Sequence, residues 1–227
     1  MNEDVFDEIR SGGEISVRTY NLLIGCCLLW GFLVNIIIVK NVNAHALVEG
    51  GSYILFIIGY FISCFAGIAL TRSDKPLVSF IGYNLVVVPF GLCVAIVLEV
   101  LSLPTTVVLS TIIVTAIITL IMMIIGMTFP EFVSKLGRFL GTALIITIII
   151  EIIGLFFFPK VFAITDIVVA LIFIGYIAYD WYKAQNCEKT VDNAIDSACE
   201  LYMDIINLFI RLLEIFGRSS GGKRSSR

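Results

Sequence analysis

A narrow stripe of polar side chains runs along the otherwise apolar segment 195–216. The stripe consists of Asp196, Glu200, Asp204, Asn207, Arg211 and Glu214. At about 100° per residue, these side chains fall within an arc of roughly 80°. A helix lying flat on a membrane has a broad polar face, so this narrow stripe predicts a helix packed among others. Carboxylates at membrane depth are costly and usually functional, which makes the stripe the first candidate site.

Asp204 has a candidate partner in the preceding apolar segment, 163–183, where Asp180 lies about one turn from the end. Antiparallel packing of the two segments brings these carboxylates near each other if a tilt offsets an axial difference of about 10 Å. Two close carboxylates in a low dielectric do not both ionise easily, so they would share a proton. Losing it would let the helices separate or admit a cation. The alternative is that Asp180 is interfacial and solvated.

Other ionisable residues could support this pair. Arg72, at the end of the second apolar segment, could reach the level of Asp180 and latch the pair shut, or it is an ordinary interfacial arginine. Arg211 is spaced to pair with Glu214 or Asn207 on its own helix. Glu151, near the end of another apolar segment, could line an outer mouth. The aspartate pair favours calcium through oxygen ligation at a weak, transient site, although protons or another cation would satisfy the same chemistry.

Composition places these residues in a membrane protein. Hydrophobic residues make up 59% of the 227 residues, charged residues only 15%, and the mean hydropathy is +1.03. Soluble domains carry about a quarter charged residues. No basic patch lies among aromatic residues, so nucleic acid is not an expected partner. One histidine and scattered cysteines give no zinc spacing, and no resident cofactor is expected.

Apolar segments long enough to span a bilayer, about 20 residues, predict an all-α membrane protein with about seven transmembrane helices. The segments are 20–39, 51–70, 77–101, 105–128, 137–158, 163–183 and 194–216. Only short breaks separate them, apart from a longer loop at 182–193. The predicted organisation is therefore a flexible N-terminal tail (1–19), one transmembrane domain (20–216) and a disordered basic tail (217–227).

Lysine and arginine residues in short loops predict a cytoplasmic N-terminus. Under this orientation the inner segments hold Arg10, Arg18, Arg72, Lys75, Lys135, Arg138, Lys183 and Lys189, and the outer loops hold Lys40 and Lys160. The basic C-terminal residues conflict with a full seventh crossing. Segment 194–216 therefore either crosses completely, which we favour, or re-enters and returns to the inside.

Two stretches resemble the signature of the Bax inhibitor family, the transmembrane Bax-inhibitor-motif proteins. They are Ile177–Asp180 (IAYD) and Glu200–Phe216 (ELYMDIINLFIRLLEIF). Length, number of spans and short loops also agree, from Tyr20 to Phe216. The chain departs from the family pattern after Asp180, where Trp181, Tyr182 and Lys183 precede a late glutamine.

The resemblance implies six helices around a central C-terminal seventh helix and a pH-sensitive calcium leak. It further implies that Asp180 and Asp204 form the proton-sensing pair and that Arg72 is the arginine that latches to Asp180. A prokaryotic member would lie in the plasma membrane and a eukaryotic one in an endomembrane, where relatives regulate cell death and calcium stores.

Two other functions are compatible with parts of the sequence. An intramembrane aspartyl protease also uses Tyr-Asp in one helix and a second aspartate in the next, but its second motif is Gly-x-Gly-Asp, whereas here Leu201–Asp204 reads LYMD. A non-conducting regulator that binds other, unknown membrane proteins would use the polar stripe only to fix helix register. The expected protein is not an enzyme.

Overall fold

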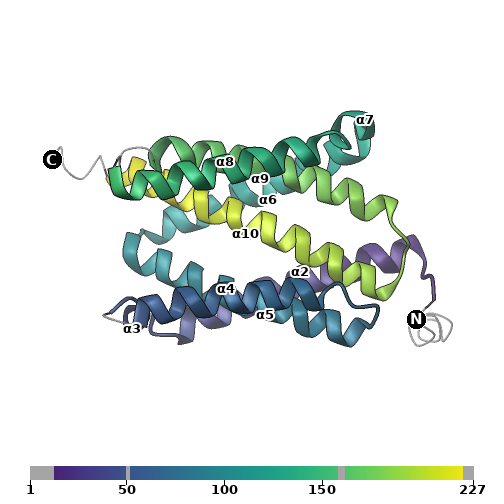
Figure 1. The fold of residues 1–227 in the computed structure, drawn as a ribbon, viewed down its shortest axis with the longest axis horizontal. Helices are drawn as coiled ribbons and strands as arrows, with labels where there is room; N and C mark the ends of the chain where they lie inside the picture. The colour runs from purple at the N-terminus through teal and green to yellow at the C-terminus, as the bar shows by residue number, and fades with distance from the viewer. Residues whose placement is uncertain (1–12, 50–51, 158–161, 222–227) are drawn as a thin grey trace. The chain divides into compact units, whose positions relative to one another are not determined.

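The computed structural model describes residues 13–49, 52–157 and 162–221, and the regular structure within these ranges is entirely helical (Figure 1). This confirms the predicted all-α class. The helices are α2 (Val17–Asn41), α3 (Ala44–Val48), α4 (Ser52–Leu70), α5 (Pro76–Leu101), α6 (Thr105–Thr128), α7 (Pro130–Val133), α8 (Leu136–Phe157), α9 (Phe162–Asn186) and α10 (Val191–Gly221).

Among the described residues, six helices are long and apolar enough to cross a membrane: α2, α4, α5, α6, α8 and α9. Their bounds lie close to the first six predicted segments. α10 is unbroken over 31 residues, which at 1.5 Å per residue exceeds the thickness of a bilayer core. α10 is not among the six apolar helices because it carries more charged residues. The full crossing favoured for this segment and its re-entrant alternative both stay predictions.

Helix boundaries follow from local chemistry. The hydroxyl of Ser16 accepts a hydrogen bond from the backbone N–H of Thr19 at 3.1 Å and caps the start of α2. Pro76 and Pro130 occupy the first positions of α5 and α7, where a missing N–H costs nothing. The starts of α2, α5 and α7 therefore follow from a capping residue and two prolines rather than from the apolar pattern.

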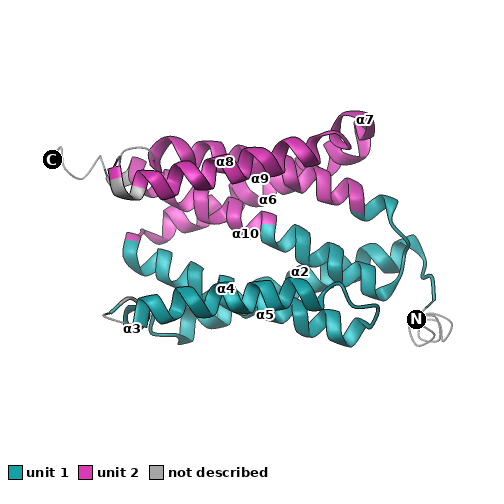
Figure 2. Ribbon diagram, viewed as in Figure 1, with its two compact units in different colours: residues 1–100, 184–203 teal, residues 101–183, 204–227 magenta. Residues whose placement is uncertain are grey.

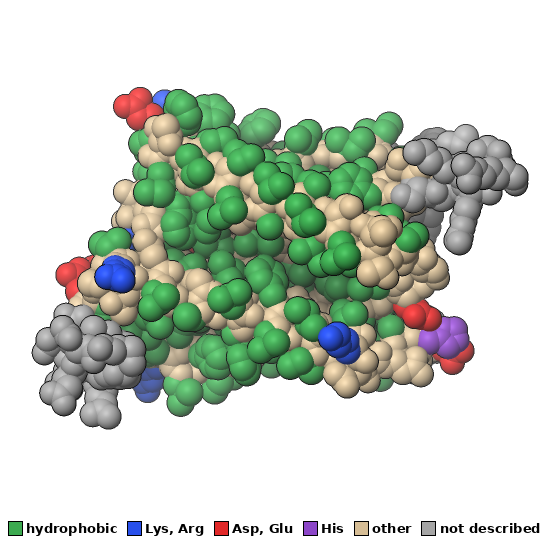
Figure 3. All heavy atoms as spheres, turned by 180° about the vertical axis from the view of Figure 1, so that it is seen from behind, with side chains coloured by type: hydrophobic (Ala, Val, Ile, Leu, Met, Phe, Trp, Pro, Cys, Tyr) green, Lys and Arg blue, Asp and Glu red, His purple; other side chains and the backbone are tan. Residues whose placement is uncertain are grey.

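Large apolar side chains are exposed along the long helices. Leu29 is 70% exposed, Leu55 73% and Phe65 69%. Figure 3 shows hydrophobic side chains along the middle of the helices on one face, with charged side chains near the helix ends. Contiguous exposed apolar surface of this extent is unstable in water. These helices are therefore surrounded by lipid, as in a multi-pass membrane protein.

The helices cluster into two compact units (Figure 2). Unit 1 comprises residues 1–100 and 184–203, and unit 2 comprises residues 101–183 and 204–227. α10 contributes its first part to unit 1 and its second part to unit 2. The single transmembrane domain predicted over 20–216 stays a prediction. The arrangement of six helices around α10 stays a prediction.

Three predicted boundaries need correction. α2 begins at Val17, so the predicted N-terminal tail, 1–19, is helical in its last residues. α10 continues to Gly221, so the predicted disordered tail does not begin at residue 217. The expected long loop at 182–193 contains only residues 187–190, because α9 continues through the polar residues that the apolar pattern excludes. Residues 1–12 and 222–227, which make up the rest of the two predicted tails, lie outside the described residues.

Candidate functional site

The polar stripe of α10 is enclosed by protein. Asp204 is buried, with 5% of its surface exposed, and the other members, Asp196, Glu200, Asn207, Arg211 and Glu214, are half-buried. A stripe on a lipid-facing or solvated surface would be exposed. Asp196 and Glu200 belong to unit 1, and the stripe from Asp204 onward belongs to unit 2.

Asp180 and Asp204 both belong to unit 2 and share a neighbour. Asp180 is half-buried on α9, one turn after Tyr176. The carboxylates of both aspartates act electrostatically on the hydroxyl of Tyr176. α9 continues to Asn186 and α10 begins at Val191, so the helix extension that the predicted pairing needed is present. Asp180 and Asp204 therefore have Tyr176 as a common neighbour within one unit.

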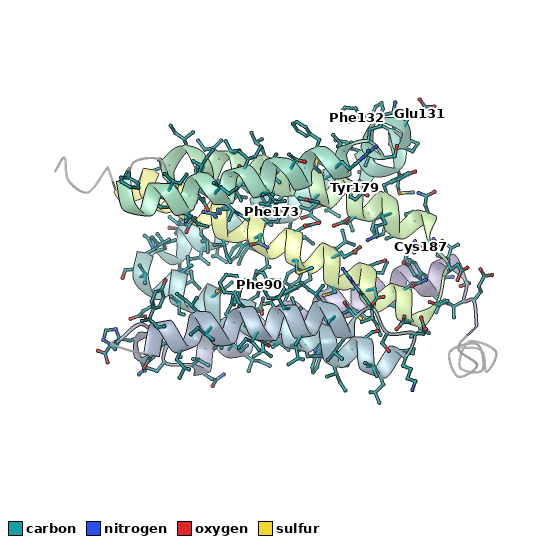
Figure 4. The ribbon with its side chains drawn as sticks, viewed as in Figure 1. Phe90, Glu131, Phe132, Phe173, Tyr179 and Cys187 are labelled. Carbon is teal, nitrogen blue, oxygen red and sulfur yellow. The ribbon has the colours of Figure 1, made fainter. Side chains whose placement is uncertain are left out.

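Glycines let α9 approach its neighbours closely in unit 2. A Cβ atom at Gly126 on α6 would lie 2.5 Å from the carbonyl oxygen of Ala178 on α9. A Cβ atom at Gly137 on α8 would lie 2.5 Å from the ring of Tyr179, which Figure 4 labels on α9. Real Cβ atoms do not occur at such distances. Since the contact at Gly126 is with backbone, only glycine lets α6 and α9 pack at this separation, whereas a side chain at Gly137 would require the Tyr179 ring to shift. The turn before Asp180 is therefore held from two sides.

A cluster of charged side chains occupies another part of unit 2, about two turns along α10 from Asp204. Nη1 of Arg211 lies 2.5 Å from Oδ1 of Asp166 on α9, and its Nη2 lies 3.0 Å from Oε2 of Glu151 on α8. Glu214 lies 3.4 Å from Nη1 of the same guanidinium. Arg218 forms an ion pair with the second oxygen of Asp166. We call these five residues the charged cluster.

The charged cluster joins three helices and is poorly accessible to water. The side chain of Asp166 is 2% exposed, that of Glu151 16% and that of Arg211 23%. Three carboxylates face two guanidinium groups, so the cluster carries one excess negative charge when every carboxyl is ionised. Removing one partner from a buried ionic group leaves an uncompensated charge, so the cluster fixes how α8, α9 and α10 pack in this unit.

Sequence reasoning placed Glu151 at an outer mouth and paired Arg211 with Glu214 or Asn207, but it did not identify Asp166 or Arg218. The signal for Asp166 was present, because it is a second aspartate in the same apolar segment as Asp180. Arg218 was assigned to the disordered tail. Its role depends on α10 continuing beyond Phe216, which the apolar pattern does not encode.

In unit 1, α10 is held by uncharged groups. Nδ2 of Asn35 on α2 donates to the hydroxyl of Tyr202 at 2.8 Å, and both residues are buried. The Tyr202 ring meets those of Tyr83 and Phe90 edge-on, with centroids 5.7 and 6.2 Å away; Phe90 is labelled on α5 in Figure 4. We call Asn35, Tyr83, Phe90 and Tyr202 the neutral cluster.

The turn between α9 and α10 is tied to the start of α2 within unit 1. The hydroxyl of Tyr20 lies 2.8 Å from that of Ser197 and 3.1 Å from the thiol of Cys187, which Figure 4 labels at this turn. Nζ of Lys189 lies 4.9 Å from the centre of the Tyr20 ring, a cation–π contact. These contacts fix the chain direction as it enters α10.

Arg72, the predicted latch, is exposed in the turn after α4. The adjoining start of α5 is tied to α10 through the buried side chain of Ser79, whose hydroxyl donates to Oδ1 of Asp192 at 2.6 Å. Arg72 belongs to unit 1 and the aspartate pair to unit 2, so its latch role stays a prediction. Across residues 13–49, 52–157 and 162–221, no group of three or more His, Cys, Asp or Glu side chains is placed to hold a metal ion.

Comparison with known proteins gives matches to bacterial proteins, among them proteins named as membrane proteins. The chain is 34% identical over 119 residues to the inner membrane protein YbhL of Escherichia coli K12, covering 48% of this chain and 50% of YbhL. It is 36% identical over 105 residues to an uncharacterized membrane protein of Streptococcus pyogenes serotype M3, covering 43% and 46%. It is 37% identical over 86 residues to an uncharacterized protein of Helicobacter pylori 26695, covering 37% and 36%. The chain thus spans half or less of the length of these relatives.

A family model covers far more of the sequence than these pairwise matches. The model described as "Inhibitor of apoptosis-promoting Bax1" matches residues 14–221. The match includes every helix described above, the aspartates of α9 and α10 and the charged cluster. The protein is a multi-pass, all-α membrane protein, and the chain belongs to the Bax inhibitor family.

Proposed function

We propose that this protein is a pH-sensitive cation leak, with calcium as the permeant ion and Asp180 and Asp204 as the gate and proton sensor. The observation that carries the proposal is a buried carboxylate at Asp204 and a half-buried one at Asp180, both acting on the Tyr176 hydroxyl. Carboxylates are rarely kept at membrane depth without a function. The proposal also follows what the resemblance of Ile177–Asp180 and Glu200–Phe216 to the family signature implies.

The gate works through the shared proton. With one proton between them, the two carboxylates hydrogen-bond and keep α9 against α10. As the pH rises the proton leaves and two negative charges repel each other in a medium of low dielectric. The separated carboxylates then offer oxygen ligands to a passing divalent cation. The leak therefore increases with pH and decreases as the pair takes up its proton.

The charged cluster supports a cation path through a different feature. Its excess carboxylate makes this part of unit 2 attractive to cations and unfavourable for anions. Arg211 restrains Glu151 and Asp166, so the attraction is moderate. Under the proposal, Glu151 is the residue that cations meet at this end of the path, and Glu151→Gln lowers the flux without removing its pH dependence.

The proposal is tested by calcium entry into dye-loaded proteoliposomes between about pH 6 and 8. The variants are Asp204→Asn and Asp180→Asn, with Asp74→Asn as the matched control, since Asp74 is exposed in the α4–α5 turn. Each removes one carboxylate. We expect the control to keep the pH dependence of the wild type and both test variants to flatten it. Equal pH dependence in all proteins would overturn the gate.

A second measurement separates the leak from a regulatory role. If well-folded wild-type protein gives no calcium flux above that of empty liposomes at any pH, the leak proposal fails. The polar stripe would then fix helix register in a regulator that binds other membrane proteins. Arg72→Gln tests, in the same assay, the latch role that the family resemblance implies for Arg72, and a larger leak at low pH is the expected result.

A further inference from the structure

A groove of about 670 Å³ lies in unit 1 between α4 and α5. This volume is within the range of small-molecule sites in proteins. Its walls come from one face of each helix, and the side chains that carry the argument below are Gly59, Ser63, Asn84, Leu85, Val88 and Pro89. The groove belongs to neither the aspartate pair nor the charged cluster.

Gly59 leaves space in this groove, and Pro89 leaves no unpaired carbonyl in its wall. A Cβ atom at Gly59 would meet no atom within 4 Å, so the missing side chain leaves real space on α4. Pro89 lies inside α5 and has no N–H to donate to the carbonyl of Leu85, four residues earlier. The hydroxyl of Ser63 donates to that carbonyl at 2.7 Å instead. The proline therefore needs no water or polar ligand to satisfy the backbone.

The remaining amide in the wall is also engaged. Nδ2 of Asn84 donates to the carbonyl of Phe80 at 2.8 Å, and its Oδ1 accepts from Nε1 of Trp30 at 2.9 Å. With Ser63 and Asn84 bound to protein partners, the groove presents almost only carbon to an occupant. A polar or charged ligand would lose its hydration there without forming new hydrogen bonds. The occupant that fits the groove is therefore an apolar chain.

We propose that the groove holds one acyl chain of a membrane lipid. α4 and α5 are both membrane-spanning helices, and the groove is continuous with their lipid-facing surface, where Val88 and the neighbouring Ile81 are 42% and 50% exposed. A lipid tail gains no hydrophobic free energy on moving from bilayer to groove. Its retention rests on the packing contacts that a concave wall provides and a flat helix surface does not. The inference is independent of the proposed leak.

Trp30 is a built-in reporter for the test. It is bonded to Asn84 in the groove wall, and its ring lies 6.1 Å from that of Phe80. Trp181 is the other tryptophan of the chain, so Trp181→Phe leaves Trp30 as the only source of tryptophan fluorescence. The full chain is reconstituted in phosphatidylcholine with brominated acyl chains, which quench tryptophan on contact. In parallel, lipid retained after detergent exchange is counted by mass spectrometry.

Gly59→Leu fills the groove, and Gly25→Leu is its matched control, because a Cβ atom at Gly25 on α2 also meets nothing within 4 Å. We expect Gly59→Leu to lower quenching about twofold and to abolish the retained lipid, because the chain loses its concave packing surface. Gly25→Leu should behave as the wild type. Val88→Phe fills the same groove from α5 and replaces Gly59→Leu if that variant does not fold.

Three results would overturn the inference. One is equal quenching and equal retention in the wild type and in both groove-filling variants. Another is retention of phosphatidylcholine but not of phosphatidylglycerol with the same tails, or the reverse, which would indicate a headgroup site. The third is a wild-type protein that retains no lipid and forms a dimer that Gly59→Leu dissociates, which would assign the groove to a second copy.

Discussion

α10 is held by two different kinds of chemistry along its length. In unit 1 the neutral cluster binds it through the Tyr202 hydroxyl, the Asn35 amide and aromatic edges. In unit 2 the charged cluster binds it through Arg211, Glu151 and Asp166. Neutral hydrogen bonds involve no charge that changes near neutral pH, whereas ionisable side chains are sensitive to their surroundings. The difference indicates that unit 1 anchors the helix through uncharged groups. Under the proposed function, unit 2 carries the response to pH.

The largest expected effect comes from Arg211→Met. The substitution leaves Glu151 and Asp166 as buried carboxylates that have lost the Arg211 guanidinium, at a cost of about 3–5 kcal/mol in unfolding free energy. The measurement is denaturant unfolding in detergent at neutral pH. Adding Asp166→Asn to Arg211→Met should recover part of the lost unfolding free energy, because it removes one of the buried carboxylates. A double variant that is less stable than Arg211→Met alone would contradict this explanation.

Tyr202→Phe tests the neutral cluster. The buried Asn35 amide loses its partner, and we expect a loss of about 1–3 kcal/mol. The loss should be the same at every pH at which the wild type is folded, because no group in this cluster changes its charge near neutrality. Tyr53→Phe, at an exposed position, is the control and should be neutral. A strongly pH-dependent loss would remove the distinction between the clusters.

Two glycine substitutions test whether overpacking in unit 2 and overpacking in unit 1 have different effects on the pH dependence of flux. Gly126→Ala in unit 2 forces a Cβ atom toward the Ala178 carbonyl, and Gly67→Ala in unit 1 forces one to 2.6 Å from the Gly82 carbonyl. Each should cost about 1–3 kcal/mol through overpacking. Only Gly126→Ala should also shift the pH dependence of calcium flux, because it moves the helix that carries Asp180. A shift caused equally by Gly67→Ala would contradict this assignment.

The smallest expected effect is that of Glu49→Gln. The His45–Glu49 contact spans 2.9 Å, close to the 3.0 Å of Arg211–Glu151, but both of its side chains are largely exposed. Water screens an exposed pair, so thermal unfolding should not change measurably. A loss approaching that of Arg211→Met would mean that burial does not determine the strength of ion pairs here.

Much of the fold was predictable because apolar length and polar breaks control it. All seven predicted segments correspond to helices, and the narrow stripe of α10 correctly indicated a helix enclosed by protein. The boundaries in polar sequence were not predictable. α9 continues past Lys183 to Asn186 and α10 past Phe216 to Gly221, because backbone hydrogen bonds and tertiary ion pairs extend a helix beyond its apolar residues.

The sequence by itself determined the class of protein, the spanning segments and the candidate aspartates, because bilayer thickness and the cost of buried charge act on residue type and spacing alone. Only the tertiary structure decided which charges meet. Arg211 pairs along its own helix with Glu214, as its spacing predicted, but Asp166 and Glu151 also reach it from α9 and α8. Pairing between helices depends on rotation and close approach, which residues such as Gly126 set and which no local pattern encodes.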